Sequence, residues 1–203
     1  LQKPTEYGID VVTHSATKYI DGQGRVMGGL VLGPRDYIKK VETFCRSTGP
    51  TISPFNAWTL SKSMETLEVR MERHCDSAKK LATALENHPE IESVKYPYLL
   101  SHPQYEIAQK QMSKGGGIVT FELKGGLKRG VTFLDSLKTC SLTANLGDSR
   151  TIVSHPASTT HYKLSDKERA EVGITPGLIR ISVGLENIID IISDIEQALN
   201  ASK

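Results

Sequence analysis

The sequence predicts an α/β protein in which a long helix joins two regions. Residues 9–33 hold two short apolar stretches around a glycine-rich turn, a pattern typical of two strands and their connection. Residues 57–86 carry apolar side chains at intervals of three and four, which predicts one amphipathic helix. Residues 87–203 alternate between strand-like and helix-like segments, which predicts a small α/β domain with a mixed or antiparallel sheet. We therefore expect a first region over residues 1–56, a connecting helix and a second domain.

The first region is expected to begin with a short buried strand over residues 9–12, because three of these four residues are apolar. A second strand is expected over 26–32, a helix over 36–44 and a loop over 49–54. The connecting helix should end at Pro89. Its apolar face comprises Leu60, Met64, Leu67, Met71, Cys75, Ala78, Ala82 and Leu85.

The second domain is expected to contain four strands and three helices. The strands are predicted over 91–96, 117–123, 143–146 and 178–183, and the helices over 127–137, 166–172 and 187–199. Ser165 stands at the start of the second of these helices, with Glu168 three residues later. This spacing predicts a capping box.

Composition and charge exclude several classes of protein. Lys and Arg number 25 against 23 Asp and Glu, and no basic block is long enough to indicate nucleic-acid binding. No apolar run approaches membrane-spanning length, and no signal peptide opens the chain. Cys45, Cys75 and Cys140 lie far apart and predict buried thiols in a reducing compartment. His155 and His161 lack the spacing and partners of a metal site. We expect a cytoplasmic protein that binds no metal, nucleic acid or membrane.

The segment around Lys18 carries the strongest chemical signal. Ser15 and Thr17 can donate hydrogen bonds to a phosphate, and the lysine amine beside them can form an imine with an aldehyde. A phosphate next to an aldehyde is the chemistry of pyridoxal phosphate, which proteins bind through a lysine. The alternative is a solvated surface lysine without a chemical role.

Arg180 is the second residue of interest. Ile179, Ile181 and Val183 alternate with it along a predicted strand, which directs Arg180 and Ser182 to the opposite face. An unpaired guanidinium is costly to bury, and its planar fork fits a carboxylate. The sequence therefore predicts an anion partner, either a bound carboxylate or the side chain of an Asp or Glu.

The run HSATKYIDGQGRVMGGLVLG over residues 14–33 resembles the lysine segment of the cysteine/methionine-metabolism family of pyridoxal phosphate-dependent enzymes. The resemblance continues in the same order along almost the whole chain. Its further segments are residues 49–55, 67–74, 101–105, 155–161 and 178–186.

The resemblance implies a type I pyridoxal phosphate-dependent transferase fold, with the end of the large cofactor domain followed by the C-terminal α/β domain. It implies that Lys18 holds the cofactor and moves protons, that Ser15 and Thr17 bind the cofactor phosphate, and that Arg180 binds the α-carboxylate of an amino-acid substrate. Asn145 stands where many relatives have a serine that helps to hold this carboxylate. Its amide is expected to replace that contact.

Residues 19–29 look most like O-succinylhomoserine sulfhydrylases, which replace the γ-succinyl group with sulfide to give homocysteine in methionine biosynthesis. Alternatives within the family are γ-elimination, as in methionine γ-lyases, and cystathionine γ-synthesis. A non-enzymatic alternative is a silent binding or assembly module. The resemblance further implies a preceding N-terminal portion and a homotetramer with sites between subunits, so we expect residues 1–203 to be inactive alone.

Overall fold

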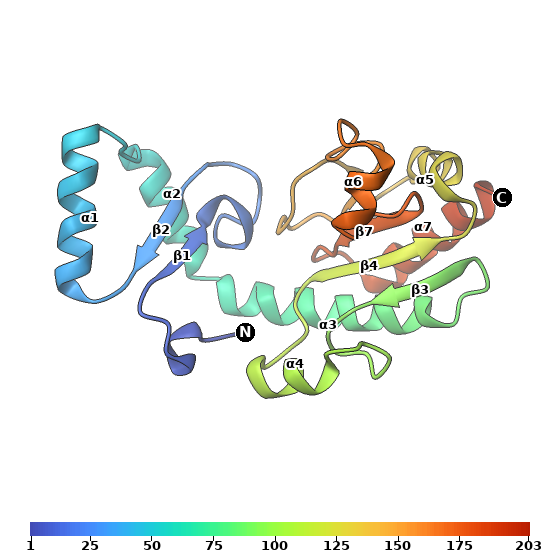
Figure 1. Ribbon diagram of the computed structural model, residues 1–203, viewed down its shortest axis with the longest axis horizontal. Helices are drawn as coiled ribbons and strands as arrows, with labels where there is room; N and C mark the ends of the chain where they lie inside the picture. Colours follow the sequence, from blue (N-terminus) through green and yellow to red (C-terminus); the bar gives the residue numbers. More distant parts are fainter.

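Helix α3 (Leu67–Glu86) runs across the molecule and connects a small N-terminal lobe to a larger C-terminal domain (Figure 1). The computed structural model describes all residues, 1–203. One face of α3 is buried along its length, in agreement with the three-and-four spacing of its apolar residues. The buried hydrophobic residues on this face are Cys75, Ala78, Leu81, Ala82 and Leu85.

The predicted single helix over 57–86 is wrong, because the structure divides it into α2 (Pro54–Met64) and α3. Ser53 caps α2 through its side chain, which accepts a hydrogen bond from the Asn56 N–H at 3.1 Å. At the other end of α2, Arg70 donates to the Ser63 carbonyl at 2.9 Å and to Thr66 Oγ1 at 3.2 Å. A side chain of α3 thus satisfies a carbonyl that a continuous helix would have used.

The N-terminal lobe contains a short helical turn, η1 (Pro4–Tyr7), and an antiparallel pair of strands, β1 (Val12–Ser15) and β2 (Gly29–Leu32). Helix α1 (Arg35–Thr48) follows β2. The prediction of a buried first strand is wrong for this chain, because β1 begins at Val12 and no further layer covers the pair. Leu30, Val31 and Leu32 remain 37%, 42% and 50% exposed.

The C-terminal domain is built on a five-stranded sheet in the order β3-β4-β7-β6-β5. Its strands are β3 (Ile91–Lys95), β4 (Ile118–Leu123), β5 (Ser141–Leu142), β6 (Ile152–Ser154) and β7 (Leu178–Ser182). Only β5 and β6 run parallel, so the expectation of a mixed or antiparallel sheet is confirmed. The helices are α4 (Tyr105–Gln111), α5 (Gly126–Asp135), α6 (Asp166–Glu171) and α7 (Ile188–Ala201).

The hydrophobic core lies between one face of this sheet and helices α3, α5 and α7. Phe121 of β4 and Phe133 of α5 meet edge to face, with ring centroids 5.8 Å apart. Val119, Ile179 and Ile181 are fully buried on the same face. The opposite face carries polar residues, and there Thr120, Arg180 and Ser154 lie side by side on three neighbouring strands.

The strand predicted over 143–146 is wrong. These residues form a loop between β5 and β6. Gly147, which follows them, has a φ of 75°, a backbone conformation that a strand does not use. The sheet instead uses β5 and β6, which the sequence did not predict, and α4 was also missed. The capping box of Ser165 and Glu168 is confirmed.

All three cysteines are free thiols. The expectation of buried thiols is confirmed for Cys75 and Cys140 and is wrong for Cys45, which is only half-buried on α1. None of the helices combines the length and apolar character needed to span a membrane. No group of three His, Cys, Asp or Glu side chains is placed to hold a metal ion.

Asp194 on α7 fixes the loop before β5, and its loss should destabilise the domain. Asp194 is 5% exposed, and its carboxylate accepts hydrogen bonds at 2.9 Å from the backbone N–H groups of Lys138, Thr139 and Cys140. Burial alone would raise the pKa of Asp194, but these donors hold the pKa well below its usual range.

We expect Asp194→Asn to lower the free energy of unfolding by roughly 1.5–3 kcal/mol at pH 7, because hydrogen bonds to a charged acceptor are lost. A depressed pKa contributes stability above the unfolded-state value, so the gap between wild type and variant should narrow as the pH falls below about 4. Urea unfolding at several pH values measures this gap. A gap that is constant or grows towards acid would contradict the role of the carboxylate.

Candidate active site

Lys18 lies on a short helical turn, η2 (Ala16–Ile20), that directly follows β1. The turn is tied to Gly28, the residue directly before β2. The Ala16 N–H donates to the Gly28 carbonyl at 2.9 Å, and Thr17 Oγ1 accepts from the Gly28 N–H at 3.1 Å. Lys18 itself has φ −91° and ψ −123°, which lies outside the helical region. The backbone at Lys18 is therefore held by its neighbours in an irregular conformation.

The amine of Lys18 contacts a neutral partner from the other domain. Its Nζ donates to Asn145 Oδ1 at 2.6 Å, and no carboxylate lies within ion-pair distance. The side chain is half-buried. The reading of Lys18 as a solvated surface lysine therefore does not describe this structure. An amine with no fixed counter-charge remains available for reaction with a bound molecule.

Arg180 projects from the polar face of β7 and has no carboxylate partner within the chain. Its Nη2 donates to the carbonyls of Ala144 and Asn145, both at 3.3 Å, while Nε and Nη1 make no hydrogen bond. Burial lowers the pKa of Arg180. The expected alternative of an ion pair with an Asp or Glu is thus not found, and most donors of the fork are free for an external anion.

Asn145 therefore contacts both predicted functional side chains. Its side-chain amide oxygen accepts from the Lys18 amine, and its backbone carbonyl accepts from the Arg180 guanidinium. The loop that carries Asn145 is fixed at two points. The Gly147 N–H donates to Ser182 Oγ at 2.9 Å, and the Ser149 N–H donates to the Gly22 carbonyl at 2.8 Å. A side chain at position 147 would place Cβ 2.7 Å from the Tyr19 nitrogen, so only glycine allows this approach.

The two predicted phosphate ligands differ in their surroundings. Ser15 is exposed and its hydroxyl has no partner, so it is free to donate to an anion. The Thr17 hydroxyl is already engaged with the backbone of Gly28, donating to its carbonyl at 3.4 Å. Ser158 and Thr159, in the loop after β6, bond locally to His155 and do not reach the other residues of the site.

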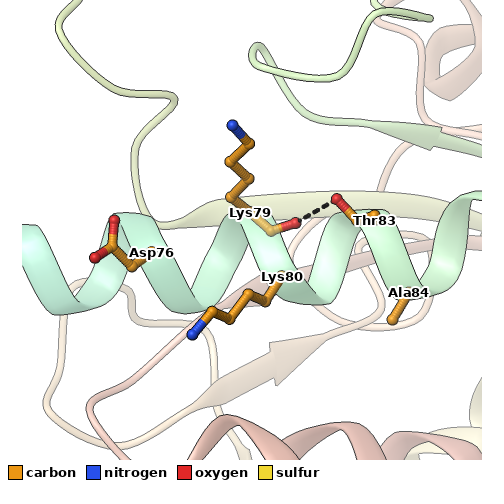
Figure 2. A pocket seen from close by; sticks show the side chains of 5 residues that line it. All are labelled: Asp76, Lys79, Lys80, Thr83 and Ala84. Carbon is orange, nitrogen blue, oxygen red and sulfur yellow. Dashed lines mark hydrogen bonds between the residues drawn. The ribbon is translucent and has the colours of Figure 1, made fainter.

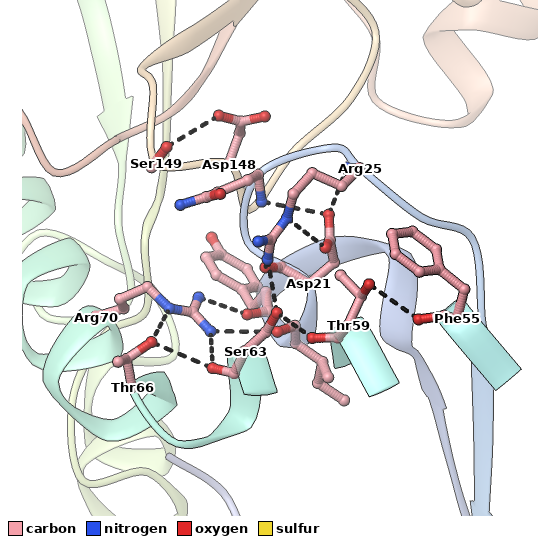
Figure 3. Close-up of polar contacts among 12 residues, drawn as sticks. Asp21, Arg25, Phe55, Thr59, Ser63, Thr66, Arg70, Asp148 and Ser149 are labelled. Atoms are coloured by element: carbon pink, nitrogen blue, oxygen red, sulfur yellow. Dashed lines mark hydrogen bonds and ion pairs between the residues drawn. The ribbon is translucent and has the colours of Figure 1, made fainter. Parts of the chain in front are cut away.

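Three residues near Lys18 were not identified as functional from the sequence. Burial raises the pKa of Tyr19 to about 12, and the neighbouring Ser182 hydroxyl opposes this shift. Tyr19 Oη is buried and has no hydrogen-bond partner. The ring of Tyr19 packs edge-on against His74 at 5.4 Å. Arg70 bonds to the turn itself (Figure 3). All three stand within the segments that carry the family resemblance, Tyr19 in 14–33 and Arg70 and His74 in 67–74, which was the available signal.

The chain also has a hollow on the outer side of α3, lined by Asp76, Lys79, Lys80, Thr83 and Ala84 (Figure 2). Thr83 Oγ1 donates to the Lys79 carbonyl at 2.9 Å, as expected for a threonine on a helix surface. All these side chains are exposed and belong to one helix. This hollow is separate from the Lys18 site.

The site fits a cofactor that carries an aldehyde and a phosphate. The aldehyde requires a lysine without a competing carboxylate, which Lys18 provides, and the phosphate requires a free donor close by in sequence, which Ser15 provides. Arg180 leaves donors open for a substrate carboxylate.

Comparison with known proteins agrees with this chemistry. Residues 1–200 match the family model described as Cys/Met metabolism PLP-dependent enzyme. The chain is 50% identical to an O-succinylhomoserine sulfhydrylase of Pseudomonas aeruginosa, and the match covers 99% of this chain and 50% of that protein. It is 47% identical to an L-methionine gamma-lyase of Porphyromonas gingivalis, over 98% and 50% of the two chains. The chain thus spans about half the length of the curated relatives it matches.

Among solved structures, a cystathionine gamma synthase from Xanthomonas oryzae pv. oryzae superimposes with a TM-score of 0.95 at 34% identity. This match covers 100% of the present chain and 52% of the synthase chain. The predicted type I fold is thereby confirmed. The chain belongs to the Cys/Met metabolism family of enzymes, which depend on pyridoxal phosphate.

Proposed function

We propose that the protein carrying this chain catalyses γ-replacement on an activated homoserine ester. O-Succinylhomoserine and hydrogen sulfide would give homocysteine and succinate. The observation that carries the proposal is the contact between the Lys18 amine and the Asn145 amide, in a loop that also receives Arg180. The similarity to an O-succinylhomoserine sulfhydrylase supports the choice of substrate.

Pyridoxal phosphate, when bound, supplies an electron sink for negative charge that develops on the substrate carbons. Lys18 is the residue that would hold it, with Ser15 as a donor to its phosphate. Thr17 can join Ser15 only if its hydroxyl leaves the Gly28 carbonyl. Once released, the Lys18 amine would act as the base that takes a proton from the substrate and returns it.

Arg180 would bind the substrate α-carboxylate through its free Nε and Nη1 donors. Two backbone carbonyls already orient its Nη2, so the plane of the guanidinium is fixed before the substrate arrives. Asn145 links this carboxylate site to Lys18, because its carbonyl contacts Arg180 and its amide contacts the amine. The Nδ2 amino group of Asn145 can donate to the carboxylate as well, because Lys18 contacts only the amide oxygen.

A second candidate is γ-elimination, which releases 2-oxobutanoate and ammonia when no thiol captures the γ-carbon. The 47% identity to an L-methionine gamma-lyase supports it. Cystathionine γ-synthesis is supported by the similarity to the Xanthomonas enzyme. We propose that residues outside 1–203, and partner subunits of a homotetramer, complete the site and decide between these outcomes.

The ratio of products should separate replacement from elimination. With O-succinylhomoserine and sulfide, we expect homocysteine to form faster than 2-oxobutanoate, because sulfide attacks the γ-carbon. Quantifying both products by mass spectrometry tests this, and O-acetylhomoserine in place of the succinyl ester reports the choice of leaving group. Dominant 2-oxobutanoate, whether or not sulfide is present, would favour the lyase activity.

Lys18 should be the lysine that holds the cofactor. Borohydride reduction of the loaded protein, followed by peptide mapping, should place a pyridoxyl group on Lys18, because its amine has no carboxylate partner. Lys18→Ala should lose the label and nearly all turnover, whereas Lys79→Ala on the outer side of α3 should keep both. A pyridoxyl group on a different lysine would refute the assignment.

Arg180→Ala should weaken substrate binding while leaving the cofactor in place. The expected cost is roughly 2–5 kcal/mol in kcat/KM, the range for losing one partner of a buried charge pair. Arg180→Lys should recover only part of this loss, because an ammonium cannot form the planar two-point contact. If neither variant changes KM or kcat/KM, Arg180 has a purely structural role.

A further inference from the structure

Arg70 is a buried arginine at the start of α3 whose contacts converge on the residues next to Lys18 (Figure 3). Arg70 is only 8% exposed. Nη1 donates to the Tyr19 carbonyl at 2.7 Å and Nη2 to the Ile20 carbonyl at 3.2 Å. Nη2 also donates to the Ser63 carbonyl at 2.9 Å, at the end of α2.

No carboxylate lies within ion-pair distance of Arg70. Burial lowers the pKa of Arg70, and the neighbouring Arg25 lowers it further, with Asp21 opposing both. Such a cation is costly to bury unless its donors are satisfied. The structure satisfies them almost entirely with backbone carbonyls, so the geometry of the fork determines where those peptide units lie.

The turn is also shaped to receive this guanidinium. Gly22 has φ 72°, and a Cβ at that position would overlap Arg70 Nη1. The Gly22 carbonyl accepts a hydrogen bond from the Ser149 N–H, so the peptide beside the guanidinium also holds the loop that contains Asn145. Arg70 therefore lies where the Lys18 turn, the end of α2 and the C-terminal domain meet.

We propose that Arg70 is a positioning residue for Lys18. The guanidinium holds the carbonyls of Tyr19 and Ile20, the two residues that follow the lysine, and ties them to the junction between α2 and α3. It thereby sets the direction in which the Lys18 side chain leaves the turn and meets Asn145. Lysine cannot replace it, because a single ammonium cannot contact three carbonyls that are spread over two elements.

The proposal rests on the proposed role of Lys18, and the test keeps the two apart. The Arg70→Lys substitution would be made in the protein that carries this sequence, and the variant protein would then be loaded with pyridoxal phosphate. Arg73→Lys is the matched control, because Arg73 lies on the same helix and donates to a backbone carbonyl, that of Glu186, at 3.1 Å from an exposed position.

We expect kcat of Arg70→Lys to fall roughly ten- to hundredfold, the cost of misplacing a reacting group by about 1 Å. KM should stay within about twofold, because Arg180 is untouched. The visible circular dichroism of the bound cofactor should change, while borohydride should still label Lys18. Arg73→Lys should change none of these readouts.

Millimolar guanidinium added to Arg70→Ala should restore part of kcat and of the visible signal, since the guanidinium can occupy the vacated position. This rescue experiment also tests the proposal if the Arg70→Lys variant does not fold. Unchanged kcat and circular dichroism in a variant that only melts earlier would overturn the proposal and leave Arg70 as a helix-junction residue. A borohydride label on another lysine would instead refute the role of Lys18.

Discussion

The structure depends on the docking of one loop of the C-terminal domain against the turn that carries Lys18. The Ser149 N–H reaches the Gly22 carbonyl across the domain boundary, and the Gly147 N–H reaches Ser182 on β7. These two hydrogen bonds hold the part of the loop that directly follows Asn145. Together with the contacts between Arg70 and the Lys18 turn, this docking gives Lys18 and Arg180 a common geometry across the two lobes.

Two half-buried or buried arginines, Arg70 and Arg180, show how the same side chain serves different purposes. Neither has a carboxylate partner in the chain, and both use backbone carbonyls. All the nitrogens of Arg70 are engaged, so it acts on the backbone. Arg180 uses only Nη2, which leaves Nε and Nη1 without a hydrogen-bond partner in the chain. From this difference in satisfied donors we propose that Arg70 organises the backbone, whereas Arg180 binds a ligand.

The sequence predicted the parts of the fold that depend on local patterns. The apolar face of α3, the alternation around Arg180 and the capping box at Ser165 each follow from side chains close together in the chain. The break between α2 and α3 was missed because it depends on Arg70 contacting the carbonyl of Ser63 and the turn after Lys18. The sequence predicts a strand over 143–146 where the structure has a loop, because neither the docking of this loop nor the positive φ of Gly147 leaves a periodic pattern in the sequence.

The candidate site divides in the same way. Lys18 and Arg180 were predicted from residue types and motif, whereas their approach to residues 144–145 required the structure, because Lys18 and Asn145 are 127 positions apart in the sequence. The engagement of Thr17 with Gly28 likewise depends on a strand pairing that the sequence does not specify.

A crystal structure of the borohydride-reduced protein with an amino-acid substrate analogue would test the central claim most directly. The account predicts a cofactor covalently attached to Lys18, with the analogue's carboxylate on Nε or Nη1 of Arg180 and the Asn145 loop still bonded to Gly22. An analogue carboxylate bound elsewhere, with Arg180 paired to an Asp or Glu of the protein, would contradict it.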